Sequence, residues 1–204
     1  MNTSFEIYVR SNGGTEYTSY YEQSGQTSIQ ENWDLIAKGV VEGKGPDVGT
    51  PIPAEAWLKN VVLKPGDSIG FYVTVLDDPN LRYRKSELAE GAIFSEDGNL
   101  GIGVGRSWGQ YPLVGDGSDT YFANREFSGS FKYHAHEGIC QTAAPSVQIL
   151  TLTPVASPDG LCSDSNALKS TFQEGTGSYG ALFDIVGKVS QVTLKGIDLN
   201  VSTK

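Results

Sequence analysis

The fold class is decided by the stretch Ser68-Ile69-Gly70-Phe71-Tyr72-Val73-Thr74-Val75-Leu76. It is rich in β-branched and aromatic residues, which favour a pleated strand. The segments on either side, 65–67 (Pro-Gly-Asp) and 77–80 (Asp-Asp-Pro-Asn), consist of turn formers. Residues 81–85 are long enough to pair back on the first strand. We therefore expect a β-hairpin at this point of the chain.

Strand patterns recur outward from this hairpin in both directions. Residues 5–10 alternate apolar and polar side chains with period two, and residues 191–200 do so with a slip at Gly196 that indicates a bulge. Helical periodicity is nearly absent, and only residues 53–60 favour one or two helical turns. The pattern predicts an all-β chain of about nine to eleven strands, arranged as a β-sandwich of jelly-roll type. Further strands are expected at 33–41, 61–63, 99–104, 127–133, 147–153 and 181–186.

The composition of the chain narrows the classes of partner that we expect. The formal net charge of −9 argues against nucleic acid and against anionic membrane surfaces. No run of 18 apolar residues is present, so we expect no membrane insertion. Residues 1–5 (Met-Asn-Thr-Ser-Phe) do not resemble a signal peptide, and we expect a leader outside this sequence because other features indicate secretion.

Three segments follow from the distribution of turn formers. Residues 1–135 form a β-sandwich core, residues 136–176 a linker or excursion, and residues 177–204 a pair of terminal strands. The excursion holds both cysteines, Cys140 and Cys162. We predict that they form a disulfide, with two free thiols as the alternative. Glycosylation sequons at Asn2 and Asn200 agree with a secreted or cell-surface location.

Short motifs in a fixed order cover residues 5–135. They include a Trp strand, two Gly-x-Gly elements, a Thr-x-x-Pro element and a Phe-Tyr-Val-Thr strand. In this order they resemble a β-rich domain found in tandem copies in large secreted proteins of diatoms and related algae. That resemblance implies a repeated structural domain without catalytic residues. The motifs are Trp33, Gly43–Gly45, Thr50–Pro53, Phe71–Thr74, Leu81–Tyr83, Gly103–Gly105, Tyr111-Pro112 and Phe127–Tyr133.

The terminal strands stand in an unusual place relative to that family. A segment similar to residues 177–199 begins the family domain, whereas here it ends the chain, and joining Lys204 to Met1 would restore the family order. Three explanations fit. The sequence is one period of a longer repeat, or its last strands complete the sheet of a neighbouring subunit, or they fold back onto their own core.

Candidate ligand sites are few. Asp116 and Asp119 lead the acidic turns that could bind Ca²⁺ without EF-hand spacing. Trp108 and Tyr111 could stack on a sugar ring, with anchoring of the loop as the alternative for Trp108. Histidines at positions 134 and 136 share a strand face, which suits a metal, but we favour surface polar residues here. No serine or cysteine has the setting of an activated nucleophile, so we expect no enzyme and no required cofactor.

These features favour a structural module of an extracellular filament, coat or adhesive protein. Like modules would associate head to tail by β-strand pairing, and apolar side chains of the terminal strands would anchor the contact. The alternative is a carbohydrate-binding module, dependent on Ca²⁺, with a polysaccharide partner. The predicted anchors are Phe183, Ile185, Val192, Leu194, Ile197 and Leu199.

Overall fold

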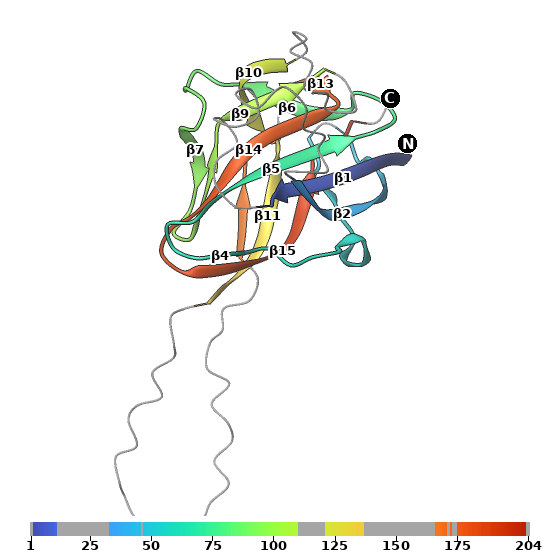
Figure 1. Ribbon diagram of the computed structural model, residues 1–204. Helices are drawn as coiled ribbons and strands as arrows, with labels where there is room; N and C mark the ends of the chain where they lie inside the picture. Colours follow the sequence, from blue (N-terminus) through green and yellow to red (C-terminus); the bar gives the residue numbers. More distant parts are fainter. Residues whose placement is uncertain are drawn as a thin grey trace, which may run out of the picture.

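The protein consists of two antiparallel sheets packed face to face, in a computed structural model that describes residues 2–11, 33–45, 47–109, 121–136, 166–170, 172 and 175–202. Figure 1 shows β14, β5 and β1 of one sheet crossing in front of β11 and β15 of the other. Within the described ranges there is no α-helix, only the short 3-10 helix η1 (Ala54–Ala56) in the segment predicted to be helical. The prediction of an all-β sandwich is confirmed, and the jelly-roll connectivity stays a prediction.

The larger sheet, sheet A, has ten strands. Its main path runs β13-β6-β10-β9-β14-β5-β1-β2, and β8 pairs with β14 and with β7. The stretch that opened the sequence analysis is β5, near the middle of this path. The ten strands are β1 (Asn2–Arg10), β2 (Trp33–Glu42), β5 (Ser68–Val75), β6 (Leu81–Lys85), β7 (Ile93–Glu96), β8 (Leu100–Gly103), β9 (Gly105–Trp108), β10 (Tyr121–Phe127), β13 (Thr176–Ser178) and β14 (Gly180–Gly187).

The smaller sheet, sheet B, has five strands in the order β12-β11-β15-β3, with β4 also paired to β15. β5 does not pair with the neighbouring β6 as the predicted hairpin requires; its partners are β1 and β14. That expectation was wrong because strands distant in sequence take both edges of β5. The strands of sheet B are β3 (Thr50–Pro51), β4 (Val62–Leu63), β11 (Gly129–His136), β12 (Asn166–Lys169) and β15 (Gln191–Leu199).

Four phenylalanines fill the space between the sheets. Phe127 and Phe183 of sheet A stack with ring centroids 4.4 Å apart, and Phe131 of sheet B meets Phe71 edge-on at 5.6 Å. All four side chains are at most 2% exposed. Burial of each such ring contributes about 2–3 kcal/mol, so this cluster is a main source of stability.

A second apolar cluster lies on the opposite face of sheet A. Trp33, Tyr72, Trp108 and Leu182 form it, and each is at most 4% exposed. Phe71 faces the main core while Tyr72 faces this second cluster, because successive side chains of a strand alternate. The run of residues 70–75 is therefore buried on both faces, which explains why its sequence is almost continuously apolar.

The cysteine-containing excursion begins and ends at neighbouring strands. β12 pairs antiparallel with β11, with Tyr133 opposite Asn166 and Ser130 opposite Lys169. β12 therefore lies within the predicted 136–176 segment, and β13, which pairs with β6, begins at its last residue, Thr176. The strand predicted at 147–153 lies outside the described residues. A two-residue turn could join strands in this register, whereas the chain uses residues 137–165.

We expect the fold to survive removal of most of that excursion. Replacing residues 137–162 with Asn-Gly would place His136 opposite Ser163 in the same register, joined by a turn that suits a hairpin. Under reducing conditions the shorter loop should raise the free energy of unfolding by about 1–2 kcal/mol, because less loop entropy is lost on closure. Urea unfolding followed by tryptophan fluorescence measures this; a variant that fails to fold would show that the excursion carries essential contacts.

Candidate functional site: the seam around the terminal strands

The two terminal strands occupy the middle of the two sheets, and we call their contacts with the rest of the chain the seam. β14 pairs with β5 along one edge, from Gly180 opposite Thr74 to Val186 opposite Ser68. Its other edge pairs with β9 and β8. Without β14, sheet A would separate into three parts: β5 with β1 and β2, β9 with β10, β6 and β13, and the β7–β8 pair.

β15 plays the same part in sheet B. One edge pairs with β11 from Gly129 opposite Leu199 to His136 opposite Gln191. The other edge pairs with β3 and β4. The ladder shifts register beside Lys132 and Tyr133, next to the slip at Gly196 that the sequence indicated. Without β15, the described strands of sheet B would be reduced to the β11–β12 pair and two isolated short strands.

All six predicted anchor residues face the core. Phe183 stacks on Phe127, and each of the six is at most 2% exposed. The structure pairs their strands with this chain's own core, which is the third of the three explanations above. The anchors are Phe183, Ile185, Val192, Leu194, Ile197 and Leu199.

Glycines line the seam where backbones approach most closely. A Cβ atom on Gly105 would overlap the carbonyl oxygen of Leu182, and one on Gly187 would overlap the carbonyl oxygen of Lys64. A Cβ on Gly180 would lie 2.6 Å from the Tyr72 ring. These positions admit no larger side chain without backbone movement. The backbones around β14 are therefore closely packed.

Asp97 connects the β7–β8 turn to the turn between the terminal strands. Asp97 accepts hydrogen bonds from the backbone of Asn99 and Leu100 (2.8 and 2.9 Å) and from the Tyr133 hydroxyl (2.7 Å). The Lys188 ammonium, in the β14–β15 turn, donates to the Asp97 carbonyl oxygen at 3.0 Å. Burial of the Tyr133 hydroxyl, reinforced by its hydrogen bond to Asp97, raises its pKa to about 12.

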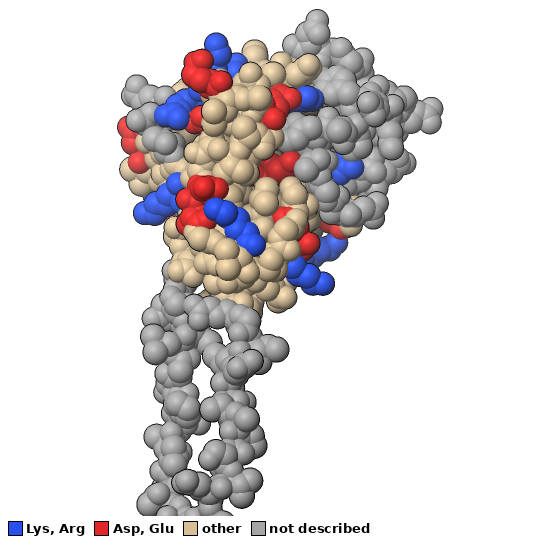
Figure 2. Space-filling model, turned by 90° about the vertical axis from the view of Figure 1, so that its left-hand side faces the viewer, with Lys and Arg blue, Asp and Glu red and all other residues tan. Residues whose placement is uncertain are grey.

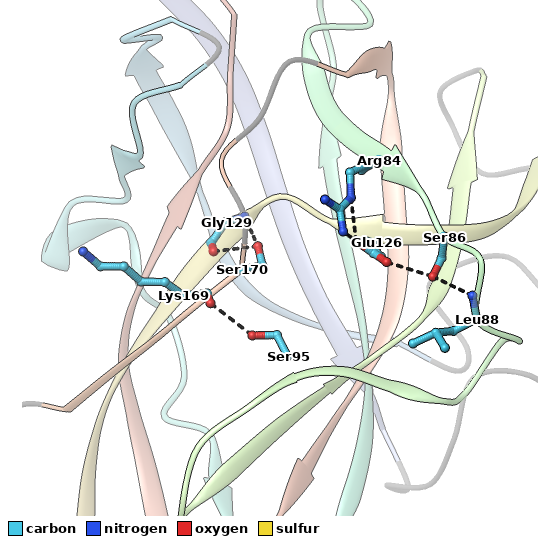
Figure 3. Close-up of polar contacts among 8 residues, drawn as sticks. All are labelled: Arg84, Ser86, Leu88, Ser95, Glu126, Gly129, Lys169 and Ser170. Carbon is cyan, nitrogen blue, oxygen red and sulfur yellow. Dashed lines mark hydrogen bonds and ion pairs between the residues drawn. The ribbon is translucent and has the colours of Figure 1, made fainter.

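Further polar contacts attach β12 to both sheets (Figure 3). The Ser170 hydroxyl donates to the Gly129 carbonyl at 2.9 Å and accepts from the Gly129 amide at 2.8 Å, which ties the end of β12 to the start of β11. The Ser95 hydroxyl, on β7 of sheet A, donates to the Lys169 carbonyl at 3.0 Å. β12 therefore bridges the two sheets at one side of the sandwich.

An ion pair between an exposed arginine and a buried glutamate orders the loop after β6 (Figure 3). The guanidinium of Arg84 binds the Glu126 carboxylate, with Nη2 2.6 Å from Oε2. The Ser86 hydroxyl donates to the other carboxylate oxygen at 2.8 Å and accepts from the Leu88 amide at 3.1 Å. Through these bonds Ser86 ties the loop after β6 to the Glu126 carboxylate.

The predicted ligand residues fall in different places. Trp108 is 2% exposed and packs on Tyr121 with ring centroids 5.6 Å apart, the geometry of loop anchoring. Asn200 is fully buried, whereas Asn2 is exposed at the start of β1. In the described part of the chain no three His, Cys, Asp or Glu side chains come together as a metal site. The remaining predicted residues, Tyr111, Asp116, Asp119, Cys140 and Cys162, lie outside the described residues.

Charges on the face shown in Figure 2 are mixed. Lysine and arginine side chains lie beside aspartate and glutamate side chains, and neither sign gathers into a broad patch. Among the described residues, Lys188 binds Glu96 at 3.0 Å, and Arg106 binds Glu90 at 2.8 Å.

The fold and the seam define an antiparallel β-sandwich closed by its own C-terminal strands. A scan against protein-family models found no matching family, and searches of the curated proteins and of the solved structures found no match either. Among the described residues, no helix has the length and apolar character needed to cross a membrane.

Alanine substitutions at the seam test its close fit. We expect Gly105→Ala and Gly180→Ala each to lower the free energy of unfolding by about 1–3 kcal/mol or more, because a well-packed site must move to admit the methyl group. Gly98→Ala is the matched control, since a Cβ there meets nothing within 4 Å; its effect should stay below about 0.5 kcal/mol. Equal effects at all three positions in urea unfolding would contradict the assignment.

The raised pKa of the Tyr133 hydroxyl predicts that the folded chain loses stability at alkaline pH. Its pKa in the folded chain, about 12, lies above the ordinary value of 10.0. The stabilisation that the protonated Tyr133 hydroxyl gives the folded chain is therefore complete below pH 10, and it disappears as the pH rises through 12. Tyr133→Phe should show a smaller alkaline loss than the unaltered chain, and Tyr179→Phe should retain the full loss. Urea unfolding at several pH values between 8 and 12 measures the difference; identical slopes for both variants would refute it.

Proposed function

We propose that the chain is a structural module of an extracellular filament, coat or adhesive protein, and that like modules associate head to tail by supplying their terminal strands to a neighbour. The observation that carries the proposal is the seam. Two strands from the end of the chain hold the middle of both sheets. A neighbouring copy that offered the same strands would make the same backbone ladders and apolar contacts.

The covalent connection permits such an exchange. Residues 166–202 contribute β12 to β15, and every one of these strands pairs with a strand from residues 2–136. The 29 residues between the two parts (137–165) can span at most about 100 Å when extended. In a single chain at low concentration, closure onto its own core is favoured because the segment is tethered nearby. High local concentration or covalent repetition favours closure with a neighbour.

The ends of the described chain also suit a repeating array. Asn2 lies opposite Glu42 in the β1–β2 ladder, and the Gly45 amide donates to the Val201 carbonyl at 3.2 Å. Both ends therefore lie at the same end of the sandwich, as the labels N and C in Figure 1 show. A chain that continued from Ser202 into a second copy would need only a short connection, which supports the repeat explanation.

The carbohydrate-binding alternative has less support. It relies on Trp108 and Tyr111 to stack on a sugar ring; Trp108 is 2% exposed, and Tyr111 lies outside the described residues. The proposal assigns no catalytic residue and no required cofactor. Secretion and the Cys140–Cys162 disulfide belong to the same proposal, because a module outside the cell meets oxidising conditions.

A stiff linker tests whether the terminal strands can act between chains. Closure within one chain requires Asn166 to lie beside Tyr133. Replacing residues 137–165 with ten prolines would hold the two parts about 31 Å apart, because a polyproline helix rises 3.1 Å per residue. We expect this variant to form dimers or larger assemblies that retain the near-ultraviolet circular dichroism of the folded chain. Light scattering after gel filtration gives the mass.

The Asn-Gly variant of residues 137–162 is the matched control, since it also lacks both cysteines but closes within one chain. It should remain a monomer at the same concentration. A proline variant that stays monomeric and unfolded, or that aggregates without the folded spectrum, would refute assembly by strand supply.

A further inference from the structure

Both histidines of the chain lie on one exposed strand face. His134 and His136 are two residues apart on β11 and are both exposed. Ala135, between them, lies opposite the fully buried Val192, so it faces the core and the two imidazoles face solvent. Positions i and i+2 of a strand are about 6.7 Å apart, which lets two imidazole rings reach one ion between them.

A hydroxyl of the neighbouring strand orients one of the rings. The His136 Nε2 atom lies 2.8 Å from the Thr193 hydroxyl oxygen. Thr193 is the residue directly opposite His134 in the β11–β15 ladder. The His136 ring therefore leans toward the row that holds His134. In the tautomer that carries its hydrogen on Nε2, the His136 ring donates to Thr193 and its Nδ1 lone pair is available to a ligand, the arrangement typical of metal-binding histidines.

The surrounding charges allow a cation to bind. Lys132, two residues before His134 on the same face, is neutralised by Asp198 at 2.8 Å. Lys195 is the remaining charged side chain on β15 near the pair, beside Thr193 and Gln191. Within the described residues, β12 begins at Asn166, opposite Tyr133, and pairs with neither histidine. The chain as a whole carries a net charge of −9, which attracts cations.

We propose that His134 and His136 form an open two-imidazole site for a divalent transition-metal ion such as Zn²⁺ or Ni²⁺, oriented by Thr193. Imidazole nitrogen is a preferred ligand for these ions and a poor one for Ca²⁺ and Mg²⁺, which take oxygen. Water occupies the remaining coordination positions of the ion. This site is independent of the proposed assembly function, because it needs only β11 and a docked β15.

The test is calorimetric titration of untagged protein with Zn²⁺ alone, in the full chain with Cys140→Ser and Cys162→Ser so that thiolates do not contribute. We expect one ion per chain. His134→Ala and His136→Ala should each weaken binding at least tenfold, because each removes one of two protein ligands. Thr193→Val keeps both imidazoles and should weaken binding about tenfold through loss of orientation. Lys195→Ala is the control and should bind as the parent does.

A second measurement does not depend on any substitution of a histidine. Because the chain has only two histidines, its imidazole nitrogen NMR spectrum reports on them alone. Paramagnetic Ni²⁺ should broaden both sets of signals together at low occupancy, and Ca²⁺ should leave them unchanged. Absence of Zn²⁺ binding, binding that survives both histidine substitutions, or broadening of one histidine only would overturn the proposal.

Discussion

The insertion of β14 between β5 and β9 is the interaction on which the rest of the structure depends. Seven of its eight residues are buried, so the strand contributes two backbone ladders and side chains to both apolar clusters. Phe183 faces the four-ring core while Leu182 faces the cluster of Trp33, Tyr72 and Trp108. Removing this one strand would open sheet A along its middle and expose both clusters, and a hydrogen-bonded sheet cannot tolerate an unpaired buried edge.

That constraint places the most important pairing late in the chain. The Thr74 hydroxyl bonds the Tyr179 carbonyl across 105 residues of sequence, and the β5–β14 ladder spans a similar separation. Such non-local contacts form slowly, because the entropy of loop closure opposes them before the contacts form. While β14 and β15 are not docked, the core exposes unpaired sheet edges, and strands of like chains can pair with them. The same physics that closes one module therefore supports the exchange between modules that we propose.

The sequence predicted which face of a strand is buried better than it predicted which strands pair with each other. Period-two alternation identified the core-facing side of residues 191–200, and all six anchor residues are buried. Alternation carries no information about which strand pairs with which. The predicted pairing of residues 81–85 with β5 was therefore wrong. β12 and β13 were missed because they are four and three residues long, and Leu168 is the one fully inward residue of β12. The close approaches at Gly105 and Gly187 could not be predicted from the sequence, because each involves a backbone more than 70 residues away.

β11 contributes both to the core and to the proposed metal site. Its inner face carries Phe131 and Tyr133 into the core, and its outer face carries the histidine pair. Thr193, which orients His136, belongs to β15. The complete metal site therefore exists only while a terminal strand is docked beside β11. By linkage, an ion bound there stabilises the docked state over the open one. The linkage is the same whether β15 comes from the same chain or from a neighbour, because the register of the β11–β15 ladder, and not the origin of the strand, sets the site.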